Sequence, residues 1–567
     1  MPALDDPLTA VADEYFDLQM RADPLTATAF GVAGYDAEVP DPSREADQRR
    51  LDRLTALADR LAGIDPAGLD EQDRVTHAML DRLLRDGRAV LAAGLGADAF
   101  EVAVTGSIAG AQSIVLSTVP AVRLTDGAAV DAYLHRLSGL AGYFDALVER
   151  YLEAAASGRV PTALGVRQAV GQVDAHLGLS LDDDPLLRPA GPAGAEVAGR
   201  VREMVARTVR PALVRFRDAL ADELLAAGRG DARAGLRHVP GGEDAYLALV
   251  RAHTTTDLTP ALIHETGLER LAAVHAELAE LGARAFGTAD AAAVLTRLRD
   301  DPSLRFGRGE EILDCVRSAL DRAVAELPRW FGPYDLAPCV VEEMHPVEAR
   351  GATLAYYRPP AADGSRPGAH VVNTLLPATR PRHEYEALAF HESVPGHHLQ
   401  LALAQTIGEL PDFRRFGYVA AHAEGWGLYT ERLADEMGLY SSDLTRMGML
   451  SFEAWRACRL VVDTGLHHLG WSRSRAVAFL RDNSATSPSN VVNEIDRYIA
   501  WPGQALAYLI GRLRIGALRA ESERRLGERF DVRDFHHQVL ASGSVPLDVL
   551  DGIVARWIAS AAETSPV

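Results

Sequence analysis

Apolar residues recur at helical spacing along most of the chain. In RLDRLTALADRLAGI, residues 50–64, four leucines fall on one face and charged side chains on the other. YLHRLSGLAGYFDALVERYL, residues 133–152, repeats this pattern, which is typical of an amphipathic helix with one buried face. We therefore predict a mainly α-helical fold. Further long helices are expected at residues 200–226, 260–284, 309–327, 383–406, 414–436, 443–468, 500–524 and 546–562.

One region has a different pattern. VVEEM (340–344), GATLAYYRPP (351–360) and GAHVVNTL (368–375) are short β-rich runs separated by Pro, Gly and Asp, so we expect a small sheet just before the helix at 383–406. An edge strand of such a sheet can hold an extended peptide by main-chain hydrogen bonds. The segment LDDDPLLRPAGPAG (181–194) is predicted to be a loop and is the candidate for a lobe boundary.

The length bounds the domain organisation. A chain of 567 residues can form several domains or one large unit that encloses a cleft. We expect a single unit, residues 1–567, with an N-terminal helical lobe over 1–240 and a second lobe over 241–567.

The charge excludes several classes of partner. A formal net charge of -21 argues against nucleic acid and against an anionic membrane surface. Lysine does not occur, which excludes any lysine-based mechanism. Three widely separated cysteines, an acidic N-terminus and the lack of an apolar run of about 18 residues lead us to expect a cytoplasmic protein without a membrane partner.

The stretch FHESVPGHHLQ contains a candidate metal site. Zinc peptidases of the H-E-x-x-H type carry a second histidine four residues after the first. Here Pro395 takes that place, and His397 and His398 follow six and seven residues after His391. In a straight helix, residues six apart differ by about 240° and residues seven apart rise by about 10.5 Å, which prevents two imidazoles from sharing one ion. Pro395 and Gly396 can loop the extra residues out and return one of the two histidines to His391.

A zinc enzyme needs a third protein ligand and an open fourth position for water. Glu424, in AHAEGWGLYTERL on another predicted helix, is a suitable third ligand. Glu392 adjoins His391 and is expected to accept a proton from the activated water instead of binding the metal. The alternative interpretation is a helix–turn–helix junction with incidental histidines.

The wider pattern resembles a bacterial family catalogued as a domain of unknown function. HESVPGHHLQ, EGWGLYTERL and RYIAWPGQALAYLIGRL carry the resemblance, with DPLTATAFG, YYRPP, VVNT, WRACRLVVDTGLHHLGW and FHHQVLASGSVPLDVL in the same order. Members of this family are similar to zinc peptidases of the gluzincin clan, distantly to the thimet oligopeptidase and carboxypeptidase Taq types. The resemblance implies a two-lobed helical fold with a deep cleft and a short sheet beside the site. It also implies that His391, His397 and Glu424 bind zinc and that Glu392 is the catalytic carboxylate.

Other polar residues of these blocks have two interpretations each. Tyr508 could donate its phenol to a developing oxyanion or be a core tyrosine, and the same alternatives hold for Tyr498 and Gln504. Arg456 and Arg459 could anchor a substrate carboxylate or pair with Asp463 at helical spacing. His422 could orient an intermediate or support a ligand from outside the first coordination shell.

These observations favour a zinc-dependent hydrolase of peptide bonds in short peptides, with Glu392 and Tyr508 as catalytic residues. One alternative is a metal-dependent amide hydrolase or cyclising enzyme of small-molecule metabolism, because fold and metal site do not fix the substrate. Another is a helical binding protein with a structural metal. The oligomeric state is not predicted.

Overall fold

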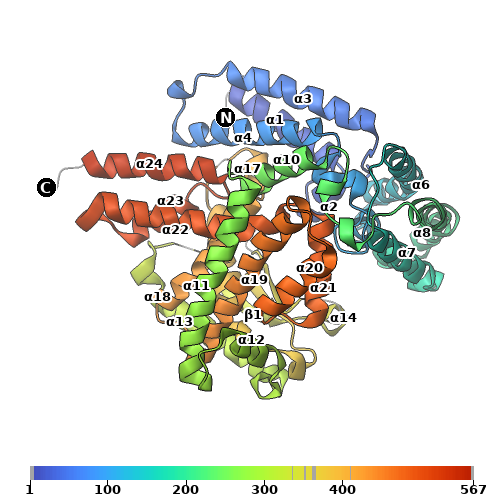
Figure 1. The fold of residues 1–567 in the computed structure, drawn as a ribbon. Helices are drawn as coiled ribbons and strands as arrows, with labels where there is room; N and C mark the ends of the chain where they lie inside the picture. The colour runs from blue at the N-terminus through green and yellow to red at the C-terminus, as the bar shows by residue number, and fades with distance from the viewer. Residues whose placement is uncertain (1–5, 335, 350–352, 361–365, 409, 564–567) are drawn as a thin grey trace.

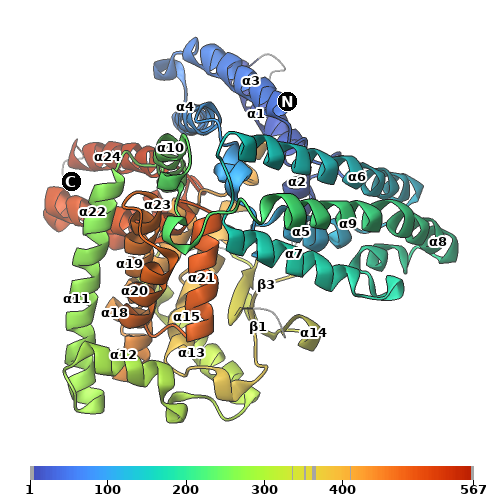
Figure 2. The ribbon, with the colours of Figure 1, turned by 45° about the vertical axis from the view of Figure 1, so that its right-hand side comes forward.

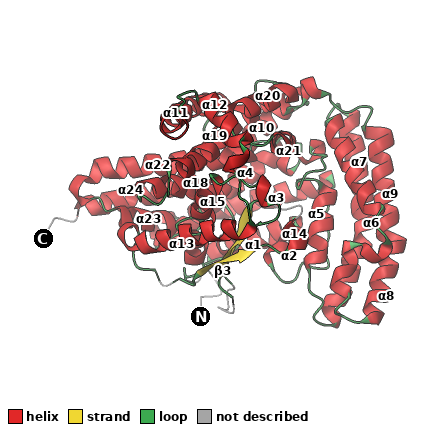
Figure 3. Cartoon of the chain, turned by 90° about the horizontal axis from the view of Figure 1, so that it is seen from below, coloured by secondary structure: helices red, strands yellow, loops and turns green. Residues whose placement is uncertain are grey.

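The computed structural model describes residues 6–334, 336–349, 353–360, 366–408 and 410–563. Helices dominate these segments, and a single small sheet accompanies them there (Figures 1 and 3). The prediction of a mainly α-helical fold with a small sheet is thus confirmed. None of the described helices is both long enough and apolar enough to cross a membrane.

The first, third and fourth helices lie across the top of the molecule in Figure 1, and the second lies below them. In the predicted helix at 50–64, Leu54, Leu57 and Leu61 are buried. Ser43 caps its first turn by accepting a hydrogen bond from the Ala46 main-chain N–H, as serine commonly does at this position. These helices are α1 (Pro7–Ala22), α2 (Pro24–Phe30), α3 (Arg44–Ala62) and α4 (Glu71–Ala92).

A bundle of helices with its own core forms one side of the molecule (Figure 2). Phe144, Leu147 and Phe216 are among its buried residues. The segment predicted to be a loop, 181–194, forms two short helical turns there and contributes Leu186 and Ala190 to this core. The bundle comprises α6 (Gly127–Ala156), α7 (Ala163–Leu177), α8 (Ala195–Met204) and α9 (Arg210–Ala219).

A larger core combines α1, α3 and α4 with the helices that follow the bundle. The first helices therefore share a core with the second predicted lobe, and the division at residue 240 stays a prediction. Among the later helices of this core are α10 (Gly242–Thr254), α11 (Pro260–Phe286), α12 (Ala291–Asp300), α13 (Gly309–Trp330), α19 (Asp443–His467), α20 (Arg473–Asn483), α21 (Pro488–Ala500), α22 (Ala507–Leu526), α23 (Val532–Leu540) and α24 (Leu547–Glu563).

The sheet has the order β1-β3-β2, with β1 parallel and β2 antiparallel to the central strand. The strands are β1 (Cys339–Glu343), β2 (Ala355–Arg358) and the fully buried β3 (Gly368–Val372). Gly351 and Ala352 of the second predicted run lie outside the described residues. The sheet precedes α15 (Glu384–Glu392) in the chain, as expected, and β2 contacts this helix.

Three predicted helices have different limits in the structure. The helix expected at 383–406 is divided into α15 and α16 (His397–Ala404). α18 (Ala420–Glu436) begins later than expected because the short α17 (Asp412–Arg415) is separate. α22 begins after Gly503, whose φ of +84° belongs to the left-handed region that favours glycine.

Candidate metal centre

Three side chains from two segments of the chain converge in the larger core. His391 lies at the end of α15, His397 begins α16, and Glu424 lies on α18. One donor atom of each residue lies within 4.8 Å of the others. The Glu424 Oε2 atom is 3.6 Å from His391 Nε2 and 3.7 Å from His397 Nε2. The structure thus brings together the three residues that the motif suggests as ligands.

The break between α15 and α16 returns the chain to His391. The His398 main-chain N–H donates to the Ser393 carbonyl, and the Trp426 indole N–H donates to the Pro395 carbonyl, at 3.0 Å in both cases. A Cβ atom on Gly396 would lie 1.9 Å from the carbonyl oxygen of His391. Glycine is therefore required at this position because the backbone of residue 396 lies against the backbone of His391. This is a second reason for glycine, beside the backbone freedom expected from the sequence.

A buried carboxylate holds the His391 ring. His391 Nδ1 is 2.8 Å from Glu431 Oε1, and only 2% of Glu431 is exposed. This hydrogen bond directs Nε2 toward Glu424 and fixes the tautomer, as carboxylates do behind many metal-binding histidines. Gly427 of α18 also packs against the His391 ring: a Cβ atom on this glycine would lie 2.6 Å from the ring. We did not predict Glu431, although it lies seven residues, or about two helical turns, after Glu424.

A chain of polar contacts also supports His397. His397 Nδ1 lies 3.3 Å from Gln400 Oε1, and Gln400 Nε2 lies 3.3 Å from His422 Nδ1. The His422 Nε2 atom is 3.0 Å from the Val539 carbonyl oxygen, which makes it the donor of that bond. Burial lowers the pKa of His422 to about 4. His422 thus lies behind a candidate ligand, which favours the supporting interpretation.

His398 points toward the sheet. Its Nδ1 atom is 3.0 Å from the Tyr357 hydroxyl of β2, and burial lowers its pKa to about 4. His398 is not part of the group of three donor residues.

The two glutamates of the site have opposite electrostatic surroundings. Burial raises the pKa of Glu392, although His391, His397 and the Tyr357 main-chain N–H oppose this shift. Burial would also raise the pKa of Glu424, but the adjacent rings of His391 and His397 keep it well below its usual value. Glu424 is therefore a carboxylate in the folded protein, in the form that binds cations.

Two tyrosines lie beside Glu424. The Tyr418 hydroxyl donates to Glu424 Oε1 at 2.7 Å, a contact we did not predict because Tyr418 precedes α18 in an irregular segment. Burial raises the pKa of Tyr508, and Glu424 raises it further, whereas Arg459 and a hydrogen bond from Gln504 lower it. Tyr508 is thus close to the candidate ligands, whereas the fully buried Tyr498 accepts a hydrogen bond from Arg459 Nε at 2.8 Å.

Of the two interpretations given for Arg456 and Arg459, pairing with Asp463 is wrong for both. Asp463 accepts hydrogen bonds from the Tyr246 hydroxyl and the Gly503 main-chain N–H. Arg459 instead forms an ion pair of 3.1 Å with Glu494 of α21. Helical spacing made Asp463 reachable, but the packing of α19 turns it toward α10.

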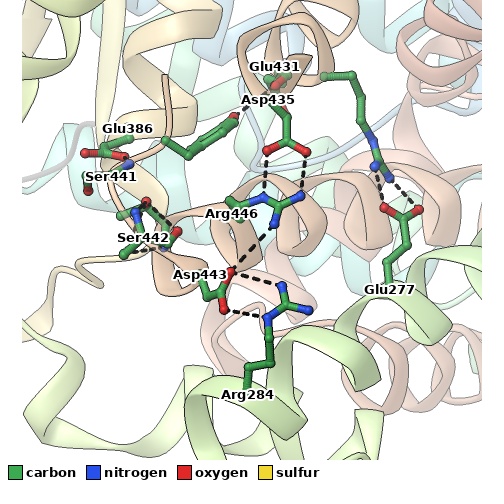
Figure 4. A network of polar contacts seen from close by, with 12 residues as sticks. Glu277, Arg284, Glu386, Glu431, Asp435, Ser441, Ser442, Asp443 and Arg446 are labelled. Atoms are coloured by element: carbon green, nitrogen blue, oxygen red, sulfur yellow. Dashed lines mark hydrogen bonds and ion pairs between the residues drawn. The ribbon is translucent and has the colours of Figure 1, made fainter. Parts of the chain in front are cut away.

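Ion pairs fix the end of α18 behind Glu431 (Figure 4). Arg446 of α19 binds Asp435 through two hydrogen bonds of 2.7 and 2.9 Å. Asp443 joins them to Arg284 of α11 at 2.8 Å. The Tyr440 hydroxyl donates to the Glu431 carbonyl at 3.0 Å. Individual partly exposed ion pairs contribute little to stability. The main effect of these ion pairs is therefore to hold α18 in register with α19.

The donor set suits zinc. Two imidazole nitrogens and one carboxylate match the three-ligand sites of catalytic zinc, where a fourth position stays open. Among the described residues this group contains three donors and no fourth.

Comparison with known proteins places the chain in a family. The sequence profile described as "Bacterial protein of unknown function (DUF885)" matches residues 24–554. The chain belongs to this family. No protein with a curated description matches the DUF885 chain significantly.

Two solved structures share the fold. One, titled "The crystal structure of the putative lipoprotein from Colwellia psychrerythraea", is 25% identical, with a TM-score of 0.86 over 98% of this chain and 99% of that one. The other, a "putative lipoprotein of unknown function" from Shewanella oneidensis, is 16% identical, with a TM-score of 0.76 over 97% and 99%. Neither description names an activity, and the cytoplasmic location of this DUF885 chain stays a prediction.

Proposed function

We propose that this DUF885 protein is a zinc-dependent hydrolase of peptide bonds in short peptides. The observation that carries the proposal is the convergence of His391, His397 and Glu424 beside Glu392, with Glu431 on the outer nitrogen of His391. The same arrangement supports the distant resemblance to gluzincin peptidases.

Each residue has a role in the proposed reaction. His391, His397 and Glu424 would hold the zinc, which when bound would supply Lewis acidity to the scissile carbonyl and to water. Glu392 adjoins His391, which would hold the metal, and its carboxylate would accept the proton of the attacking water. It then passes this proton to the leaving amine. The Tyr508 hydroxyl donates to the oxyanion that develops on the carbonyl oxygen.

The substrate is expected to bind beside β2. This strand is at an edge of the sheet, and its residue Tyr357 lies next to both Glu392 and His398. An extended peptide can add to such an edge by main-chain hydrogen bonds. The two-lobed shape with a deep cleft remains part of the proposal. A described cavity of about 250 Å³ lies elsewhere, between α7 and α21, and is lined by Gln168, Arg473 and Asp496.

The deciding experiment compares Glu392→Gln with the wild-type protein. The substitution keeps the size of the side chain and removes its base. With zinc supplied, we expect full metal content by elemental analysis and a decrease of about 10²–10⁴-fold in hydrolysis of a mixed peptide library, read by mass spectrometry. Loss of zinc would make Glu392 a ligand, and unchanged hydrolysis would remove it from the mechanism.

The same experiment addresses the alternatives. A metal-dependent amide hydrolase or cyclising enzyme would leave the peptide library intact but convert small amides. A structural metal would require a fourth protein ligand, and spectroscopy of a cobalt-substituted protein would then show no exchangeable water.

A further inference from the structure

Arg456, on α19, is a buried cation to which the described residues offer no hydrogen-bond acceptor. Only 7% of the residue is exposed, and both Nε and Nη1 are shielded from solvent. Among the residues that the structure describes, none accepts a hydrogen bond or forms an ion pair with its guanidinium. Leaving such donors unsatisfied costs on the order of several kcal/mol, so an arginine in this state needs an explanation.

Two other buried arginines, Arg82 and Arg136, donate hydrogen bonds from all three of their nitrogen atoms. Arg82 bonds Asp86, Asp548 and a main-chain carbonyl. Arg136 donates to Thr28 and to carbonyl oxygens of the N-terminal segment. Within the described residues, buried Arg414 and Arg459 each leave one nitrogen without an acceptor but bond through their others, whereas Arg456 leaves two without an acceptor.

The guanidinium of Arg456 is held in place but not neutralised. Its Cζ atom lies 4.7 Å from the ring centroids of both Phe452 and Trp455. Stacking on aromatic faces orients the planar group and leaves its N–H edge free for a planar anion.

Arg456 lies next to the candidate metal centre. Burial lowers its pKa, whereas the nearby groups of Glu431, Tyr508 and Glu424 raise it. In the described part of the chain neither glutamate forms an ion pair with Arg456; Glu431 is bound to His391, and Glu424 faces both histidines. Arg459, one turn further on, is paired with Glu494 and lies 4.5 Å from the Tyr508 ring.

We propose that Arg456 binds the free α-carboxylate of the substrate, which makes the protein a hydrolase that shortens peptides from their carboxyl end. This inference rests on the proposed function. A carboxylate matches the guanidinium edge through two parallel hydrogen bonds and satisfies the orphaned donors. Because the protein carries a net charge of -21, a local cation is needed to hold an anionic substrate group.

Binding is tested without turnover in the zinc-supplemented Glu392→Gln protein. The probes are an N-acetylated dipeptide with a free carboxylate and the same dipeptide as its amide. By calorimetry we expect the acid to bind at least about tenfold more tightly, and Arg456→Met in this background to abolish the difference. If the carboxylate of the acid instead binds only to the metal, the tighter binding of the acid would persist in Arg456→Met. That result would overturn the proposal.

Thermal stability separates a binding role from a structural one. Removing an unpaired buried charge should leave the melting temperature of Arg456→Met unchanged or raise it. Arg481→Met on α20 is the control: it loses an exposed ion pair with Asp482 and should keep the preference for the acid. The proposal would be contradicted if Arg456→Met lost much stability and the protein with Arg456 bound acid and amide equally. Arg456 would then have a structural role only.

Turnover distinguishes this inference from the proposed function. With active protein, hydrolysis of free-acid peptides but not of their amides, with residues lost from the carboxyl end, supports both. Equal hydrolysis of acids and amides supports the peptidase and contradicts the role of Arg456. If no peptide is hydrolysed but the acid is still bound more tightly than the amide, the proposed peptidase activity is contradicted. The assignment of Arg456 as a carboxylate-binding residue is then still supported.

Discussion

Two adjacent histidines, His397 and His398, have opposite surroundings. The first faces Glu424 and the second faces the Tyr357 hydroxyl. The spacing of the motif could not show which of the two faces the candidate metal site. Adjacent residues of a helix point about 100° apart, but the break before α16 leaves the rotation of that helix relative to α15 undetermined by the sequence.

We predict that His397→Ala loses zinc and that His398→Ala keeps it. The first substitution removes one of three donors, whereas the second removes only a contact between α16 and the sheet. Elemental analysis of both purified variants provides the measurement, and circular dichroism controls for folding. Zinc retained by folded His397→Ala would overturn this assignment.

At the scale of elements, the site depends on how closely helices approach one another. α15 and α18 meet where Gly427 faces the His391 ring, and α18 meets α22 where Gly425 faces Gly511. Helices can come this close only where a side chain is absent.

We expect Gly427→Ala to weaken zinc binding by about 10–100-fold, because the added Cβ would lie 2.6 Å from the His391 ring and displace it from Glu431. Overpacking should also cost about 1–3 kcal/mol of stability. The matched control is Gly516→Ala on α22, where no atom lies within 4 Å of the added Cβ. This control should gain about 0.5–1 kcal/mol and keep its zinc affinity. Equal zinc affinity in both variants would show that the ring position does not depend on Gly427.

Helix positions and the motif could be predicted from the sequence because they depend on local spacing. Periodicity located α3, α6 and α11, and the Pro-Gly pair predicted the interruption after α15. Contacts between distant segments could not be predicted in this way. Glu494, which pairs with Arg459, is 35 residues away, and Tyr418 reaches Glu424 from an irregular segment. Only the packing of α19 against α21 and the path of the chain before α18 decide these contacts.

At the scale of the whole molecule, Asp463 joins three parts of the larger core. It lies on α19, and it binds Tyr246 of α10 and the main chain at Gly503 before α22. Burial raises its pKa from 3.8 to about 7, against the opposing hydrogen bonds. The folded state therefore holds this proton more tightly than the unfolded state does. The resulting stabilisation is complete below about pH 4 and is lost as the pH rises through about 7.

We predict that the difference in unfolding free energy between wild type and Asp463→Asn decreases between pH 4 and pH 7 and is constant above that range. The expected change is on the order of a few kcal/mol. Denaturant titrations at a series of pH values, at a fixed zinc concentration, provide the measurement. A difference that does not depend on pH would mean that Asp463 is ionised throughout.

The separate core of the α6–α9 bundle affects how unfolding of this protein is observed. All six tryptophans lie between Trp330 and Trp557, outside the bundle, whose aromatic core residues are Tyr133, Tyr143, Phe144, Tyr151 and Phe216. Indole fluorescence therefore monitors the part of the protein that contains the metal centre, and opening of the bundle leaves this signal unchanged. Circular dichroism records the helices of both parts. Where the two signals have different midpoints, the protein unfolds in more than one cooperative step, and each midpoint belongs to its own part of the chain.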